Sequence, residues 1–275
     1  MTEECGILNI ATCLPQALYD FFMNVINSPI QPLLDMLKFF LTEPVNITIF
    51  NPLWAIMIYV ISLFYGILLL YSGFNFIISG YDAEKRNKAK EWLRNIVIMV
   101  VLVQASYFLY SLTLDIGSLL TAGIINLVGD EFFLLSIDNL VNIGLQFVFL
   151  LLYLLSVLIT ALLLTIRYII VCAGVVFIPI GIFFYFIPAL NNYGRLILNF
   201  LGICIFITFF DALIFLVCSK IVEIDFFANF KILVMISAFS LANLLMLYLI
   251  FFSAIKSAFN TVDSVATSSV VKYLK

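Results

Sequence analysis

Long runs of apolar residues without charge constrain the fold of this chain more than any other feature. No charged residue lies between Glu43 and Asp82, and similar runs recur as far as Ile255. A helix of about 20 apolar residues crosses the hydrocarbon core of a bilayer, which is about 30 Å thick. Because 65% of the residues are hydrophobic and only 11% are charged, a water-soluble fold would have too little polar surface to cover itself. The sequence therefore predicts an integral membrane protein.

Six segments have the length and the composition of membrane-spanning helices. They are residues 54–79, 95–114, 139–166, 168–194, 196–219 and 232–255. None of them alternates apolar and polar residues with a period of two, as the strands of a membrane barrel do. We therefore predict an all-α fold, a polytopic helical membrane protein with five to six transmembrane helices.

Composition divides the chain into three parts. Residues 1–51 form an extracytoplasmic or interfacial N-terminal segment, in which residues 14–42 are apolar but broken by charges and prolines, so we expect short interfacial helices there. Residues 52–258 form the transmembrane helical domain, and residues 259–275 form a C-terminal tail. The N-terminus has no basic region followed by a short apolar run, so we expect no cleavable signal peptide.

Basic residues predict the orientation in the membrane. Five of the 13 Lys and Arg residues lie in the hairpin 81–94, namely Lys85, Arg86, Lys88, Lys90 and Arg94. Loops rich in Lys and Arg stay on the cytoplasmic side, and Trp92 is well placed as an interfacial anchor. We therefore expect a multi-pass protein of the plasma membrane with a cytoplasmic hairpin 81–94 and an N-terminus outside the cell.

Two features fit an N-terminal segment outside the cell. Residues Asn46, Ile47 and Thr48 form a tripeptide sequence of the kind that accepts N-linked glycans. Cys5 and Cys13 lie close together in the sequence and are candidates for a disulfide in an oxidising compartment.

The segment 168–194 decides how often the chain crosses the membrane. It contains Gly174, Pro179, Gly181 and Pro188, which make it the most breakable of the six. Six crossings would place eight basic residues inside and five outside. If the broken segment enters and returns to the same side, ten lie inside and three outside. We prefer this five-crossing arrangement, with broken-helix positions at Pro179 and Pro188 and a cytoplasmic C-terminus.

Polar residues inside the spans are candidates for function. Asp211 lies near the middle of its span, where an ionised carboxylate costs about 2.5 to 3.5 kcal/mol, so it must face protein, water or a partner. A structural pairing with Arg167 or Arg195, a protonated hydrogen-bonded carboxyl and a pore-lining or proton-coupled site all remain open. We expect Asp115 to lie at the membrane interface, near the outer end of its span.

The uncharged polar residues within the spans are Gln104, Gln146, Asn199 and Asn243. Hydrogen bonds between helices explain such residues more often than contacts with a substrate do. The candidates for a pore or an intramembrane polar site are therefore Asp211, Arg167, Gln104 and Asn199.

The chain contains no histidine. This excludes Ser-His-Asp and Cys-His catalysis and metal sites built on imidazole. We expect no enzymatic activity, no cofactor and no metal site. Cys172, Cys204 and Cys218 lie within spans and are expected to be small apolar packing residues.

Two stretches resemble a known family. In residues 68–117, two spans flank a short charged helical turn in which Arg86, Lys90 and Arg94 share one helix face. In residues 162–210, Arg167 opens an apolar helix, Pro179 lies within it, Pro188 ends it, and the polar turn 191–195 precedes the next span. Together they resemble the TrbL-type polytopic membrane subunit of conjugation and type IV secretion machines, and the small size is similar to that of the archaeal DNA-import (Ced-type) members.

The resemblance implies a subunit of a DNA-transfer machine. Such a subunit forms part of a translocation channel or platform for single-stranded DNA, as a homo-oligomer in the lipid bilayer with a pilin-like subunit and a cytoplasmic ATPase. The hairpin 81–94 has a net charge of only +2, which favours docking of the ATPase or another partner over direct DNA binding. The alternatives are a small-molecule or ion transporter that uses Asp211, and a scaffold of an envelope assembly without a pore.

Overall fold

The computed structural model describes residues 28, 30–129, 132–133, 143–228, 230–252 and 255. Within these residues the chain is helical and contains no strand. Five helices are long and apolar enough to cross a membrane: Thr48–Ile78, Ser106–Val128, Val148–Phe186, Asn191–Val222 and Lys231–Phe252. The prediction of an all-α, polytopic helical membrane protein is therefore confirmed. The candidate disulfide of Cys5 and Cys13 lies outside the described residues.

The helices follow one another with short connections. Residues 30–42 are helical. The elements after them are η2 (Thr48–Phe50), α2 (Asn51–Ile78), η3 (Ser79–Tyr81), α3 (Ala83–Gln104), α4 (Ser106–Val128), α5 (Ile143–Phe186), α6 (Asn191–Val222), α7 (Asp225–Ala228) and α8 (Lys231–Leu247). A π-helical turn, Tyr248–Phe252, continues α8.

Local sequence explains several helix boundaries. Pro52 occupies the first turn of α2, where its missing N–H leaves no hydrogen bond unmade. Asp82 caps α3, because its carboxylate accepts hydrogen bonds from the backbone N–H groups of Glu84 and Lys85. Gly129 follows α4 with a φ of 73°, the left-handed conformation in which glycine commonly ends a helix.

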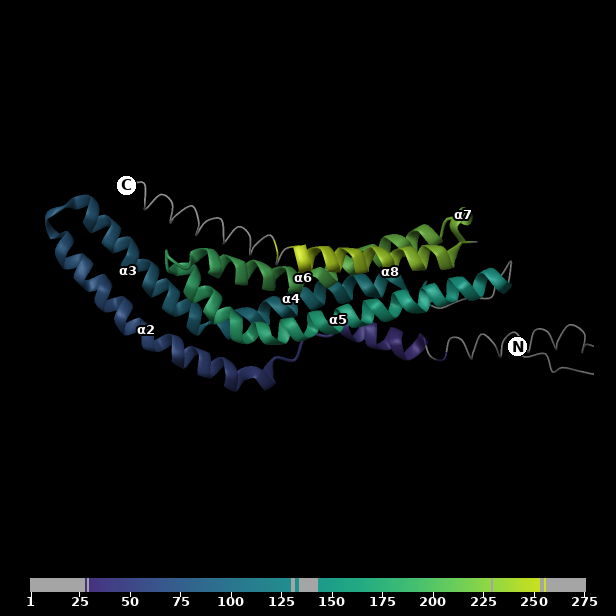
Figure 1. Cartoon of the computed structure of the whole chain (residues 1–275), viewed down its shortest axis with the longest axis horizontal. Helices are drawn as coiled ribbons and strands as arrows, with labels where there is room; N and C mark the ends of the chain where they lie inside the picture. The colour runs from purple at the N-terminus through teal and green to yellow at the C-terminus, as the bar shows by residue number, and fades with distance from the viewer. Residues whose placement is uncertain are drawn as a thin grey trace, which may run out of the picture. The chain divides into compact units, whose positions relative to one another are not determined.

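The helix α5 corrects the predicted division of the chain (Figure 1). The sequence predicts separate spans at residues 139–166 and 168–194, whereas α5 is one helix of 44 residues with Arg167 inside it. At 1.5 Å per residue it is about 66 Å long, roughly twice the thickness of the hydrocarbon core. The five candidate spanning helices are therefore not the five crossings that the sequence favours.

The predicted break at Pro179 is also wrong, whereas the chain does turn at Pro188. Pro179 is buried inside α5, and the helix continues to Phe186. A proline removes one backbone hydrogen bond, but neighbouring helices in a membrane bundle can compensate for it. Residues 187–190, which include Pro188, form the turn between α5 and α6.

The predicted span 95–114 lies on two helices that meet at Ala105. The distortion is local, because Ala105 N–H donates to Val101 O and Leu109 N–H donates to Ala105 O, at 2.9 and 3.0 Å. The candidate spanning helix is α4, which begins at Ser106. The first half of α3 is occupied by the charged turn.

The described chain falls into two compact units. The first unit contains residues up to Glu43, Thr121–Thr165 and Phe209–Leu245. Its core is an aromatic cluster in which Phe133, Tyr153, Phe215 and Phe239 are almost completely buried. The Tyr153 hydroxyl donates to the Phe133 carbonyl at 2.8 Å, so the one polar atom of the cluster is satisfied.

The second unit contains Pro44–Leu120, Ile166–Thr208 and the residues from Met246 onward. Its core joins the hairpin of α2 and α3 to the end of α5 through a cluster of five buried residues, namely Ile61, Ile96, Met99, Val103 and Phe183. Figure 1 shows α2 and α3 side by side as a helical hairpin.

Two glycines of α6, Gly194 and Gly202, differ in the space around them, so alanine at the two positions should affect stability differently. A Cβ added to Gly194 would meet the Tyr185 backbone and would lie 2.7 Å from the Gly181 carbonyl oxygen, whereas a Cβ on Gly202 would meet nothing within 4 Å. We predict that Gly194→Ala destabilises the protein by about 1–3 kcal/mol, because rigid backbone must move. The measurement is the midpoint of thermal unfolding of the purified protein in detergent.

Gly202→Ala is the matched control. Since alanine is a better helix former than glycine by about 1 kcal/mol, it should leave the midpoint unchanged or raise it. Equal midpoints for the two variants would contradict the close approach of α6 to α5.

Candidate functional site

The hairpin of α2 and α3 presents the predicted basic cluster on an exposed surface. Along α3, Ala89, Ile96, Met99 and Val103 are buried, at the spacing of three and four residues that lets one helix face pack on a neighbour. The five basic residues Lys85, Arg86, Lys88, Lys90 and Arg94 are all exposed. The packed face fixes α3 and leaves the cluster open to a partner.

Ion pairs engage only part of this cluster. Lys88 pairs with Glu84 at 2.7 Å, and Lys85 lies 3.8 Å from Asp82. In the described part of the chain, no ion pair involves the remaining three residues, Arg86, Lys90 and Arg94. Their spacing of four residues places them along one face of α3, which we call the basic row.

On the C-terminal side of the basic row, the same face of α3 carries apolar, exposed side chains. Val97 and Val101 continue the same side of α3 and are 53% and 61% exposed. Trp92 is half-buried and packs edge-on against Tyr71 of α2, with ring centroids 6.3 Å apart. Basic residues, an aromatic anchor and then exposed aliphatic residues form the pattern expected of a helix that enters a bilayer from its surface.

Arg167 is the most deeply placed charged group of the second unit. It is 5% exposed. Its Nε donates to the Cys204 carbonyl at 2.7 Å and its Nη2 donates to the Ile205 carbonyl at 3.0 Å. A guanidinium within a membrane helix is costly unless carbonyls or carboxylates accept its hydrogen bonds. Arg167 therefore fastens α5 to α6 inside the bundle.

A tyrosine of α4 adds a third helix to this junction. The Tyr110 hydroxyl, 1% exposed, donates to the Val171 carbonyl of α5 at 2.6 Å. A Cβ on Gly174 would clash with this hydroxyl and would lie 2.9 Å from Leu201, so the helices meet closely here. The sequence reasoning missed both residues, because Tyr110 is one of 13 tyrosines and Gly174 is named there only as a possible break point.

Asp211 belongs to the first unit and is 1% exposed, so its side chain is enclosed by protein and does not face lipid.

Asn243 is also buried, and its Nδ2 donates to the Ser156 carbonyl at 3.1 Å, which confirms the expected hydrogen bond between helices. Gln104 and Asn199 are exposed, and their proposed role in a pore stays a prediction. Arg195 is exposed and lies over the Tyr185 ring, 5.8 Å from its centroid.

Asp115 is exposed and lies near the middle of α4, a helix long and apolar enough to cross a membrane. The sequence places it at the membrane interface, and that position stays a prediction.

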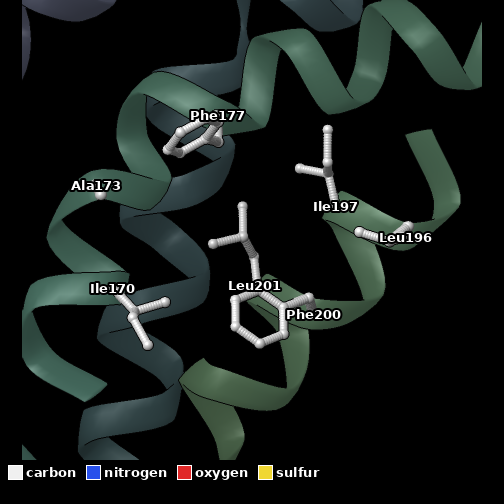
Figure 2. Close-up of a pocket in the computed structure, with 7 residues that line it drawn as sticks. All are labelled: Ile170, Ala173, Phe177, Leu196, Ile197, Phe200 and Leu201. Atoms are coloured by element: carbon white, nitrogen blue, oxygen red, sulfur yellow. The ribbon is translucent and has the colours of Figure 1, made fainter. Parts of the chain in front are cut away.

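A groove of about 300 Å³ lies between α5 and α6 (Figure 2). The residues that line it are Ile170, Ala173 and Phe177 of α5 and Leu196, Ile197, Phe200 and Leu201 of α6. All seven side chains are hydrocarbon, so the groove offers no ligand atoms to an ion or to a phosphate. Within the described residues, no group of three or more Cys, Asp and Glu side chains could hold a metal ion.

No protein family, no curated protein and no solved structure matches this chain.

The junction at Arg167 predicts that charge alone cannot replace the guanidinium. Lysine keeps the charge but lacks the planar fork that reaches two carbonyls, so Arg167→Lys should lower stability by about 2–3 kcal/mol. The matched control is Arg195→Lys, at an exposed position, which should change stability by less than about 0.5 kcal/mol. The measurement is the unfolding midpoint in detergent, and an Arg167→Lys variant as stable as the control would contradict the junction.

Proposed function

We propose that this chain is an integral membrane subunit of a DNA-transfer machine of the conjugation or type IV secretion kind. It forms part of a translocation channel or platform for single-stranded DNA. The observation that carries the proposal is the exposed basic row on the α2–α3 hairpin. This charged hairpin belongs to one of the two stretches that resemble the TrbL-type family.

The length of α5 supports membership of a larger assembly. Even at a tilt of 40°, the upper end of the usual range, a helix of about 66 Å spans roughly 50 Å along the bilayer normal, well beyond the hydrocarbon core. Arg167 is the only charged residue in α5. An apolar helix that leaves the lipid must be covered by protein, and other subunits of a machine would provide that cover.

The basic row is better suited to a protein partner than to DNA. Asp82, Glu84 and Glu91 reduce the net charge of residues 81–94 to +2, and two lysines already lie near carboxylates. Binding to a phosphate backbone needs many unpaired cations. We propose that the basic row docks a cytoplasmic ATPase, with the hairpin in the cytoplasm of an archaeal cell and the N-terminus outside the plasma membrane.

The basic row yields a direct genetic test. Replacement of Arg86, Lys90 and Arg94 by Glu reverses the charge that a partner would meet, so DNA transfer should fall by about tenfold or more. The measurement is DNA transfer between cells of the source organism, with the amount of variant protein in the membrane checked by immunoblotting.

The charge-matched control replaces Lys85 and Lys88, which lie near acidic partners, by Glu, and is compared with the double variant Arg86→Glu and Lys90→Glu. The control should transfer DNA better than this double variant, because those two charges are less available to a partner. Normal transfer by the triple variant, or by a strain that lacks the protein altogether, would contradict the proposed function.

A second function, as a small-molecule or ion transporter, is favoured by one observation. Asp211 is buried about two thirds of the way along α6, a helix that is long and apolar enough to cross a membrane. Buried carboxylates at such positions often mark ion or proton pathways. No internal repeat of the kind common in transporters is evident in the sequence.

Asp211→Asn separates the two functions, because it removes the charge and keeps the shape. We expect DNA transfer to change less than about threefold, as for a structural carboxyl that keeps its hydrogen-bonding capacity. Loss of ion or solute flux in this variant, measured in vesicles that contain the purified protein, together with normal DNA transfer, would favour the transporter.

A further inference from the structure

The loop before α2 contains a motif that the proposed function does not use. Asn46, Ile47 and Thr48 form the tripeptide Asn-x-Ser/Thr, the acceptor sequence for N-linked glycans. No other asparagine of the chain is followed, two positions later, by serine or threonine. An N-linked glycan on this chain therefore has one expected position.

The backbone around Asn46 leaves its side chain accessible. Residues 44–47 belong to no helix or strand, so an enzyme can bind them without unwinding an element. Val45 and Ile47 are only 7% and 5% exposed, whereas Asn46 and Thr48 are exposed. The two buried side chains anchor the loop, and the two polar residues of the motif stay at its surface.

Hydrogen bonds within the motif orient the acceptor amide. The Asn46 Oδ1 accepts a hydrogen bond from the Thr48 hydroxyl at 2.6 Å and another from the Thr48 backbone N–H at 3.1 Å. This is an Asx turn, in which an asparagine side chain bonds to the backbone two residues later. In the described part of the chain, no hydrogen bond involves the Asn46 Nδ2. The amide oxygen is therefore engaged, while the nitrogen, which is the atom that bonds to a sugar, stays exposed.

The helix α2 separates this loop from the basic hairpin. It has 28 residues and is about 42 Å long, which exceeds the thickness of the hydrocarbon core. Asn46 precedes the helix, and the hairpin 81–94 follows it. With the hairpin in the cytoplasm, as proposed, the loop lies on the outer face, where N-linked glycans occur. The inference rests on this proposed orientation and not on the role in DNA transfer.

We propose that Asn46 is the acceptor of an N-linked glycan. The co-reactant is a polyprenyl-phosphate-linked oligosaccharide, and the catalyst is an oligosaccharyltransferase. The Asn46 Nδ2 attacks the anomeric carbon of the first sugar, so that an N–C bond forms and the C–O bond to the lipid phosphate breaks. The phosphate leaves with the electron pair, and the amide nitrogen releases one proton to a base of the transferase.

Peptide mass spectrometry of the protein purified from the source organism tests this site. We expect the peptide that contains Asn46 to carry the added mass of sugar residues, and Asn46→Gln to lose it. Thr48→Ala should also lose the glycan because it removes the hydroxyl, whereas Thr48→Ser should keep it. The matched control is Asn51→Gln, at an exposed asparagine outside the motif, which should leave the glycan in place.

Two results would overturn the proposal: an unmodified Asn46 in the wild-type protein, and a glycan that persists in Thr48→Ala. If Asn46 is unmodified, treatment of Asn46→Cys with a membrane-impermeant maleimide shows which premise fails. Reaction in intact cells, assigned to position 46 by mass spectrometry, overturns the glycan alone. Reaction only after lysis also overturns the proposed orientation. Neither result depends on the DNA-transfer assay, so the two proposals can fail separately.

Discussion

The Arg167 guanidinium is the interaction on which the second unit depends. It donates to two carbonyls of α6 from the interior of α5, where an uncompensated charge would be costly. Because hydrogen bonds to fixed backbone atoms allow little sliding, they set the register of α5 against α6. The Tyr110 hydroxyl and the close contact at Gly174 then set the position of α4. A polar junction of this kind specifies one packing where aliphatic side chains alone would allow several.

The packing of α5 in the second unit also determines which surfaces are exposed. With α5 and α6 fastened together, the cluster around Phe183 holds the α2–α3 hairpin, and that packing orients the basic row outward. The exposed apolar faces and the length of α5 both require cover from lipid or from other subunits. These properties are those of one component of an assembly, and they suit the proposed DNA-transfer machine better than a protein that works alone.

The sequence predicts the fold class because a helix that crosses lipid must be long, apolar and nearly free of charge. These properties can be read from the sequence without knowledge of how the helices pack. It also predicts the exposed basic cluster, since five charges on a short helix cannot all be buried. It does not predict the continuity of α5, because whether a proline breaks a membrane helix depends on its tertiary surroundings and not on the local sequence alone. It does not predict the boundary between α3 and α4 either, because no proline or glycine lies near Ala105 to mark the distortion there. Nothing in the sequence singles out Tyr110, because only the hydrogen bond of its hydroxyl in the folded structure distinguishes it from the other tyrosines.

The continuity of α5 through Arg167 and Pro179 is the central claim, and a single distance tests it. Spin labels at Ile166 and Tyr185, both exposed positions of α5 in the second unit, can be measured by double electron–electron resonance in lipid nanodiscs. An uninterrupted helix predicts a narrow distribution centred at about 28 Å. A helix that breaks at Pro179 and turns back would bring the labels to within about 20 Å, and that result would contradict the account.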